Sequence, residues 1–195
     1  MISTLKKYLK DKYRFFKSPK VHHYEMDSIP ASVLFICKGN ICRSPFAEHL
    51  AKKMVSGSPF QGLVFQSAGL RVIEPIASPF DVISVAETFG CDLKNHVSRH
   101  ITRDMASSVD LIACMETWHV ACLRDLFPEM ENKILLLSRF EKDRASSMWS
   151  YSNDNILDPY GKTISHYLEC FKRIERCIEG LLLDFQKLSS NGQSL

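Results

Sequence analysis

Short hydrophobic runs alternate with amphipathic segments along the chain from residue 32 onward. The runs are continuously hydrophobic, which is typical of parallel strands that are buried on both faces. The segments between them have hydrophobic residues at helical spacing, and they end at glycine or before proline. We expect strands at 33–37, 63–65, 110–115 and 133–137, and helices at 44–51, 80–89, 118–126 and 164–185.

This order of elements predicts an α/β fold. Strands that alternate with helices form right-handed βαβ units around a parallel sheet. The polar residues 139–157 are expected to form a loop before the last helix. Ligands bind such sheets at the carboxyl ends of the strands, so the functional residues are sought in the loops that follow the strands.

The loop after the first strand has a sequence suited to binding phosphate. Residues 37–45 read Cys-Lys-Gly-Asn-Ile-Cys-Arg-Ser-Pro, with a strand before them and a helix expected from Ser44. A loop in this place points backbone N–H groups at one spot, at the positive end of the helix dipole. Gly39 and Asn40 tolerate the left-handed backbone that such a loop needs.

Three side chains of this loop suit nucleophilic chemistry on phosphorus. Cys37 ends the strand, where the amides and the helix dipole stabilise a thiolate. Arg43 can hold two oxygens of a phosphoryl group with its planar fork, and Ser44 can donate a hydrogen bond to the sulfur. The alternative is a buried strand cysteine and a surface arginine, but the place of the motif between strand and helix favours a functional site.

The loop resembles that of the low-molecular-weight protein-tyrosine phosphatases, whose C-x-G-N-x-C-R-S-P motif is complete here. The resemblance covers about residues 32–187 and points to bacterial members associated with exopolysaccharide or capsule export, through residues 67–70, 96–99 and 127–130. It implies a small doubly wound sheet of four parallel strands with flanking helices. It also implies hydrolysis of phosphotyrosine through a cysteinyl-phosphate on Cys37.

The resemblance assigns roles to further residues. It implies that the phosphate is bound by loop residues Lys38, Gly39, Asn40, Ile41, Cys42 and Ser44, and that Ser67 and His96 support the loop. Without the resemblance, His96 would be interpreted as a surface residue.

A second motif implied by the resemblance lies just before the last helix. Asp158-Pro159 matches the family's general acid, which protonates the leaving phenol and then activates water. Tyr160 matches an aromatic residue that stacks on the substrate ring, although Gly161 stands where many eukaryotic members have a second tyrosine. Considered alone, Asp-Pro-Tyr is a common turn.

Other residues leave alternatives open. Arsenate reductases share this fold and loop but use two further cysteines, for which Cys114 and Cys122 are candidates. A phosphotyrosine-binding module without catalysis is a further alternative, although such a module has no use for an acid at Asp158. Relatives specific for phosphoarginine carry threonine at the position of Ile41, and isoleucine favours phosphotyrosine. Cys42 is near enough to Cys37 for a disulfide under oxidising conditions.

Changes in composition along the chain predict three regions. Residues 1–30 form a basic N-terminal extension, residues 31–187 the phosphatase domain and residues 188–195 a flexible C-terminal tail. Residues 1–20 carry seven basic side chains against one acid, Asp11, and are interpreted either as a mobile basic tail or as a segment that makes weak contact with a membrane surface.

The rest of the composition indicates a cytoplasmic enzyme. The seven cysteines follow no disulfide framework, and no hydrophobic run suits a signal peptide or a membrane span. The net charge of +3 does not favour nucleic acid. We expect no cofactor and no metal, although His22 and His23 are adjacent. The expected partner is a tyrosine-phosphorylated protein, and the resemblance implies an autophosphorylating tyrosine kinase that controls polysaccharide export.

Overall fold

A four-stranded parallel sheet forms the centre of the molecule. The computed structural model describes residues 26–142 and 151–192. The strands are β1 (Ser32–Cys37), β2 (Val64–Gly69), β3 (Leu111–Cys114) and β4 (Ile134–Leu136), in the spatial order β2-β1-β3-β4. All neighbouring strands are parallel. The chain leaves β1 toward β2 on one side and later returns to β3 on the other, so the end of β1 is the switch point where ligands bind in such sheets.

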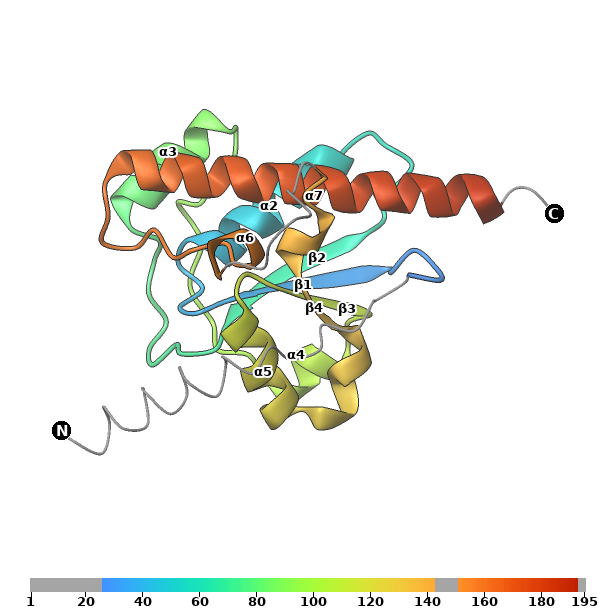
Figure 1. Ribbon diagram of the computed structural model, residues 1–195. Helices are drawn as coiled ribbons and strands as arrows, with labels where there is room; N and C mark the ends of the chain where they lie inside the picture. Colours follow the sequence, from blue (N-terminus) through green and yellow to red (C-terminus); the bar gives the residue numbers. More distant parts are fainter. Residues whose placement is uncertain (1–25, 143–150, 193–195) are drawn as a thin grey trace.

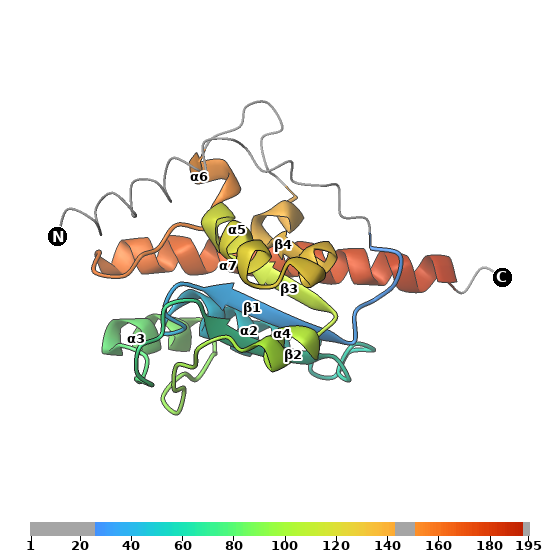
Figure 2. The ribbon, with the colours of Figure 1, turned by 90° about the horizontal axis from the view of Figure 1, so that it is seen from below.

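Helices cover both faces of the sheet. The α-helices are α2 (Arg43–Val55), α3 (Phe80–Thr88), α4 (Arg103–Ser107), α5 (Thr117–Leu126), α6 (Tyr151–Asp154) and α7 (Ile164–Gly192), and the 3₁₀ helices are η1 (Pro128–Lys133) and η2 (Leu137–Phe140). Helices α2, α3 and α7 lie on one face, while α4 and α5 lie on the other (Figure 1). Figure 2, seen from below, brings α4 and α5 to the front. The predicted doubly wound α/β fold is therefore confirmed.

The two faces of β1 belong to two hydrophobic cores. Val33 and Phe35 pack in the core under α2, α3 and α7, whereas Leu34 and Ile36 pack in the core under α4 and α5. All four side chains are fully buried, which explains the uninterrupted hydrophobic run of β1. No helix of the described residues is long and apolar enough to cross a bilayer.

Two short helices differ from the expectations. The stretch 139–157 is not a plain loop, because α6 lies within it. The carbonyl oxygens of Ser152, Asn153 and Asn155 accept hydrogen bonds from Arg173 of α7, so this helix depends on a tertiary partner. Helix α4, capped by the Thr102 side chain, is too short to show a helical period in the sequence.

The domain also extends past both expected boundaries. Met26 and Ile29 already pack against the core, and α7 continues beyond residue 187 to Gly192. The expected tail therefore begins within a helix. The basic segment 1–20 and His22-His23 lie outside the described residues.

Candidate active site

The loop between β1 and α2 wraps around the sulfur of Cys37. Asn40 has φ of 52°, which makes it the one non-glycine residue in the left-handed region among the described residues. Its backbone N–H donates a hydrogen bond to Cys37 Sγ over 3.2 Å. Gly69 ends β2 beside this turn, and a Cβ there would lie 2.9 Å from the Asn40 nitrogen. The close approach of loop and strand therefore requires glycine at this position.

Ser44 lies inside α2, one residue after the helix begins. Helix α2 begins at Arg43, and its capping residue Cys42 makes no side-chain cap. Instead, Ser44 Oγ lies 3.0 Å from Cys37 Sγ and accepts a hydrogen bond from Asn40 Nδ2 over 3.0 Å. Asn40 supplies one proton to this oxygen, so the hydroxyl's own proton can point either at the sulfur at 3.0 Å or at the Ala68 carbonyl at 3.3 Å, and when it points at the sulfur it stabilises a thiolate.

Hydrogen bonds with β2 and with the segment 96–99 hold Asn40 in its left-handed conformation. Asn40 Nδ2 donates to Ser67 Oγ over 2.9 Å, and the Asn40 carbonyl lies 2.7 Å from His96 Nε2. The Arg99 backbone N–H donates to Asn40 Oδ1 over 2.9 Å. Ser67 Oγ in turn donates to Glu48 Oε2 over 2.6 Å. The sequence pointed to Ser67 and His96, whereas Arg99 and Glu48 are additions that only their contacts reveal.

The guanidinium of Arg43 is buried at the mouth of the loop. Its Nη1 donates to Glu116 Oε1 over 2.6 Å and to the Ile156 carbonyl over 2.8 Å. Its Nη2 lies 3.1 Å from Asp158 Oδ2. Its Nε is buried and bonds no acceptor in the described part of the chain. Nη1 is thus committed to the protein, and the Nε–Nη2 edge remains as the fork that fits two phosphoryl oxygens.

Arg43 keeps its charge although its side chain is only 1% exposed. Burial by itself lowers the pKa of Arg43, but the neighbouring Cys37, Asp158 and Glu116 outweigh burial and raise the pKa above its usual value. A permanent positive charge is therefore held beside the sulfur.

Glu116 is a site residue that the sequence analysis missed. It lies two residues beyond the end of β3, holds Arg43 with one carboxylate oxygen, and accepts a hydrogen bond from the Tyr151 hydroxyl on the other over 2.9 Å. Its own backbone N–H donates to His119 Nδ1. The available signal was an acidic residue at the carboxyl end of a parallel strand, where sites of this fold class collect.

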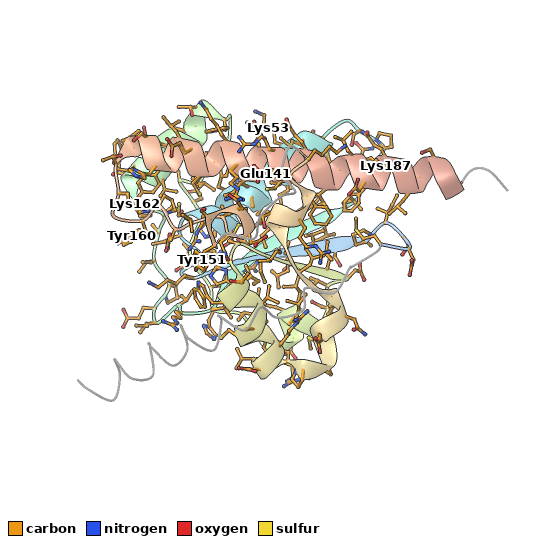
Figure 3. The ribbon with its side chains drawn as sticks, viewed as in Figure 1. Lys53, Glu141, Tyr151, Tyr160, Lys162 and Lys187 are labelled. Atoms are coloured by element: carbon orange, nitrogen blue, oxygen red, sulfur yellow. The ribbon has the colours of Figure 1, made fainter. Side chains whose placement is uncertain are left out.

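Asp158 and Tyr160 lie on the loop before α7, at the mouth. The Asp158 side chain is 34% exposed and Tyr160 is 59% exposed. The segment is fixed by the bond from the Ile156 N–H to the Met115 carbonyl and by Arg43. Figure 3 shows Tyr160 and Lys162 together at one end of the molecule, with Tyr151 nearby and Lys187 at the opposite end of α7. The Asp158 carboxyl group therefore lies next to the Arg43 guanidinium, and the exposed ring of Tyr160 follows two residues later in the sequence.

Comparison with known proteins shows the family of this chain. Residues 32–194 match the family model of the low molecular weight phosphotyrosine protein phosphatase. The chain belongs to this family.

Its relatives include bacterial phosphatases. The low molecular weight protein-tyrosine-phosphatase Wzb of Salmonella typhi is 33% identical over 74% of this chain and 87% of that protein. Etp of Escherichia coli is 30% identical over 74% of this chain and 88% of that protein. The crystal structure of the tyrosine phosphatase AmsI of Erwinia amylovora covers 82% of this chain and 96% of that one, with 26% identity and a TM-score of 0.70.

The remaining thiols near the phosphatase loop are buried and protonated. Burial raises the pKa of Cys42 well above its usual value, with Cys170 adding to the effect. Burial raises the pKa of Cys170 to about 12. None of the seven cysteines, all of them in the described residues, is in a disulfide. Cys37 is the thiol that the loop amide and Ser44 contact, so it is the candidate nucleophile.

Replacing Glu116 with glutamine is expected to lower kcat/KM by about tenfold. The amide keeps the shape but removes the charge that orients Arg43, and a charge-assisted hydrogen bond contributes about 1.5–3 kcal/mol. Steady-state kinetics with an aryl phosphate and a thermal melt test this. Glu129→Gln, which loses only an exposed ion pair with Arg103, is the matched control. Wild-type kcat/KM in folded Glu116→Gln would show that Arg43 needs no anionic anchor.

Proposed function

We propose that this chain hydrolyses phosphotyrosine in proteins through a cysteinyl-phosphate on Cys37. The observation that carries the proposal is the convergence of three groups at one mouth. The sulfur accepts the Asn40 N–H, the buried Arg43 charge interacts with Cys37 and has an unbonded Nε, and Asp158 lies 3.1 Å from Arg43 Nη2. Nucleophile, phosphate clamp and acid are the parts that this reaction needs.

In the first step the Cys37 thiolate attacks phosphorus and the bond between phosphorus and the tyrosyl oxygen breaks. The phosphoryl oxygens take the Nε–Nη2 edge of Arg43, which draws Nη2 away from Asp158. Asp158 then donates its proton to the leaving tyrosyl oxygen, so tyrosine departs neutral. The loop amides and Arg43 carry the charge that develops on the equatorial oxygens.

In the second step water attacks the phosphorus of the cysteinyl-phosphate. The Asp158 carboxylate takes a proton from the water, and the sulfur–phosphorus bond breaks. The sulfur leaves as a thiolate, which the Asn40 N–H and the Ser44 hydroxyl stabilise at 3.2 and 3.0 Å. Phosphate departs and Cys37 is ready for another cycle.

The substrate we propose is a tyrosine-phosphorylated protein, specifically an autophosphorylating kinase that controls polysaccharide export. The resemblance to the bacterial members of the family supports this choice. A thiolate nucleophile beside further free cysteines also favours a reducing compartment, so we place the enzyme in the cytoplasm.

The structure does not favour arsenate reduction. Cys37 packs with the core under α2 and α7, whereas Cys114 packs in the core on the opposite face of the sheet. Burial raises the pKa of the Cys114 thiol far above its usual value. A disulfide relay from Cys37 through Cys114 would have to cross the sheet.

Phosphoarginine is a second substrate class that the test must include. The arginine phosphatase YwlE of Geobacillus stearothermophilus has this fold, with a TM-score of 0.68 at 24% identity. The half-buried Ile41 in the loop favours phosphotyrosine in this chain.

A single assay series separates these functions. We expect hydrolysis of p-nitrophenyl phosphate and of a phosphotyrosine peptide without added metal, blocked by vanadate, and little hydrolysis of phosphoarginine. Thiol-dependent arsenate reduction without phosphatase activity would replace the proposal with the reductase. Tight binding of the phosphotyrosine peptide without hydrolysis would replace it with a binding module.

A further inference from the structure

The loop that follows β2 forms one wall of the mouth. The Leu70 N–H donates to the Cys37 carbonyl over 3.1 Å, and the Arg71 N–H donates to the Lys38 carbonyl over 2.8 Å. Lys38 directly follows the nucleophile, so the backbone of Arg71 is fixed to the edge of the phosphate loop. The side chains of Lys38 and Arg71 are exposed.

An aromatic ring, and no carboxylate, holds the Arg71 guanidinium. Its central carbon lies 5.1 Å from the ring centre of Trp118, in the first turn of α5. Across the described ranges, neither Arg71 nor Lys38 has an acidic partner, and Glu74 of the same loop pairs with neither. Stacking on a ring fixes the plane of a guanidinium and leaves its N–H edges unused.

The Trp118 ring packs against a buried histidine that stays uncharged. The buried ring of His119 lies 4.0 Å from that of Trp118, centre to centre. Burial lowers the pKa of His119 well below its usual value, and the charges of Arg43, Arg71 and Lys38 lower it further. His119 therefore adds no positive charge of its own to this wall, whose cations are Arg71 and Lys38.

We propose that Arg71 and Lys38 bind an acidic side chain next to the phosphotyrosine, so that the preferred substrates are acidic around the phosphorylated residue. The inference rests on the proposed function, because phosphate in the loop fixes the peptide over Lys38. Successive residues of an extended peptide are about 3.5 Å apart, which brings a flanking side chain within reach of this wall. A carboxylate is the planar partner that the free edge of an arginine fits.

The test compares three phosphotyrosine peptides that differ only in their flanking residues: glutamate, glutamine or lysine on both sides. In the wild type we expect kcat/KM for the glutamate peptide to exceed that for the glutamine peptide by about fivefold, with lysine lowest. Arg71→Gln should reduce the preference to about twofold or less and leave p-nitrophenyl phosphate hydrolysis unchanged. Trp118→Leu, which frees the guanidinium, should give an intermediate preference.

Lys187→Gln is the matched control, because it removes one positive charge at the far end of α7 (Figure 3). Its preference should equal that of the wild type, and the wild-type preference should shrink at high salt. Equal hydrolysis of all three peptides by an active wild type would overturn the inference and leave the proposed function standing. An Arg71→Gln loss that is equal for all three peptides would also overturn it, because it would assign Arg71 to loop structure. Failure of the wild type on p-nitrophenyl phosphate would refute the proposed function itself.

Discussion

Replacement of Cys37 with serine is expected to lower kcat by at least about 10⁴-fold and to leave the fold intact. The hydroxyl fits the same place, and the Asn40 N–H and Ser44 can still bond to it. A hydroxyl stays protonated where a thiol ionises, and serine has no base beside it to remove the proton. Turnover of p-nitrophenyl phosphate measures the loss, and a thermal melt checks the fold.

The matched control for this prediction is Cys91→Ser. Cys91 is also a buried cysteine, but it lies after α3 and bonds weakly to the Phe89 carbonyl. It should retain wild-type kcat. Mass spectrometry of the quenched wild-type reaction should find phosphate on Cys37. Turnover by Cys37→Ser within about tenfold of wild type would contradict the assignment of the nucleophile.

Replacement of Asp158 with asparagine is expected to lower kcat on phosphotyrosine by about 100-fold or more, the range typical of general acid catalysis. The asparagine side chain keeps the shape and can still accept a hydrogen bond from Arg43 Nη2, but its amide group cannot act as an acid. The loss should be smaller for an activated aryl phosphate, whose phenolate leaves without protonation. The measurement is the ratio of the two losses.

Asp184→Asn is the control for Asp158→Asn. Asp184 pairs with Lys187 on the exposed surface of α7, so its loss should change neither substrate's kcat. If Asp158→Asn slows both substrates equally, Asp158 supports the loop through Arg43 and does not act as the acid.

Features that depend on neighbouring residues could be predicted from the sequence. The continuous hydrophobic run of β1 predicted a strand buried on both faces, and the structure confirms it because Phe35 and Ile36 enter different cores. The left-handed turn of the phosphate loop was predicted from Gly39 and Asn40, and it falls on Asn40. Such features can be predicted because the backbone conformation of a turn and the spacing of buried side chains along an element depend on nearby residues.

Which distant side chains complete the site depends on packing, and of the two carboxylates at Arg43 only Asp158 was singled out beforehand, through the family resemblance. Glu116 and Asp158 reach Arg43 from 73 and 115 residues away. In the sequence the first was one acid after a strand, and the second stood in an ordinary Asp-Pro turn. The parallel register of β1 and β3 brings the end of β3 beside the phosphate loop, and Arg173 fixes the segment that carries Asp158. Strand order and register depend on the packing of the whole chain, so no local pattern shows which carboxylates meet the guanidinium.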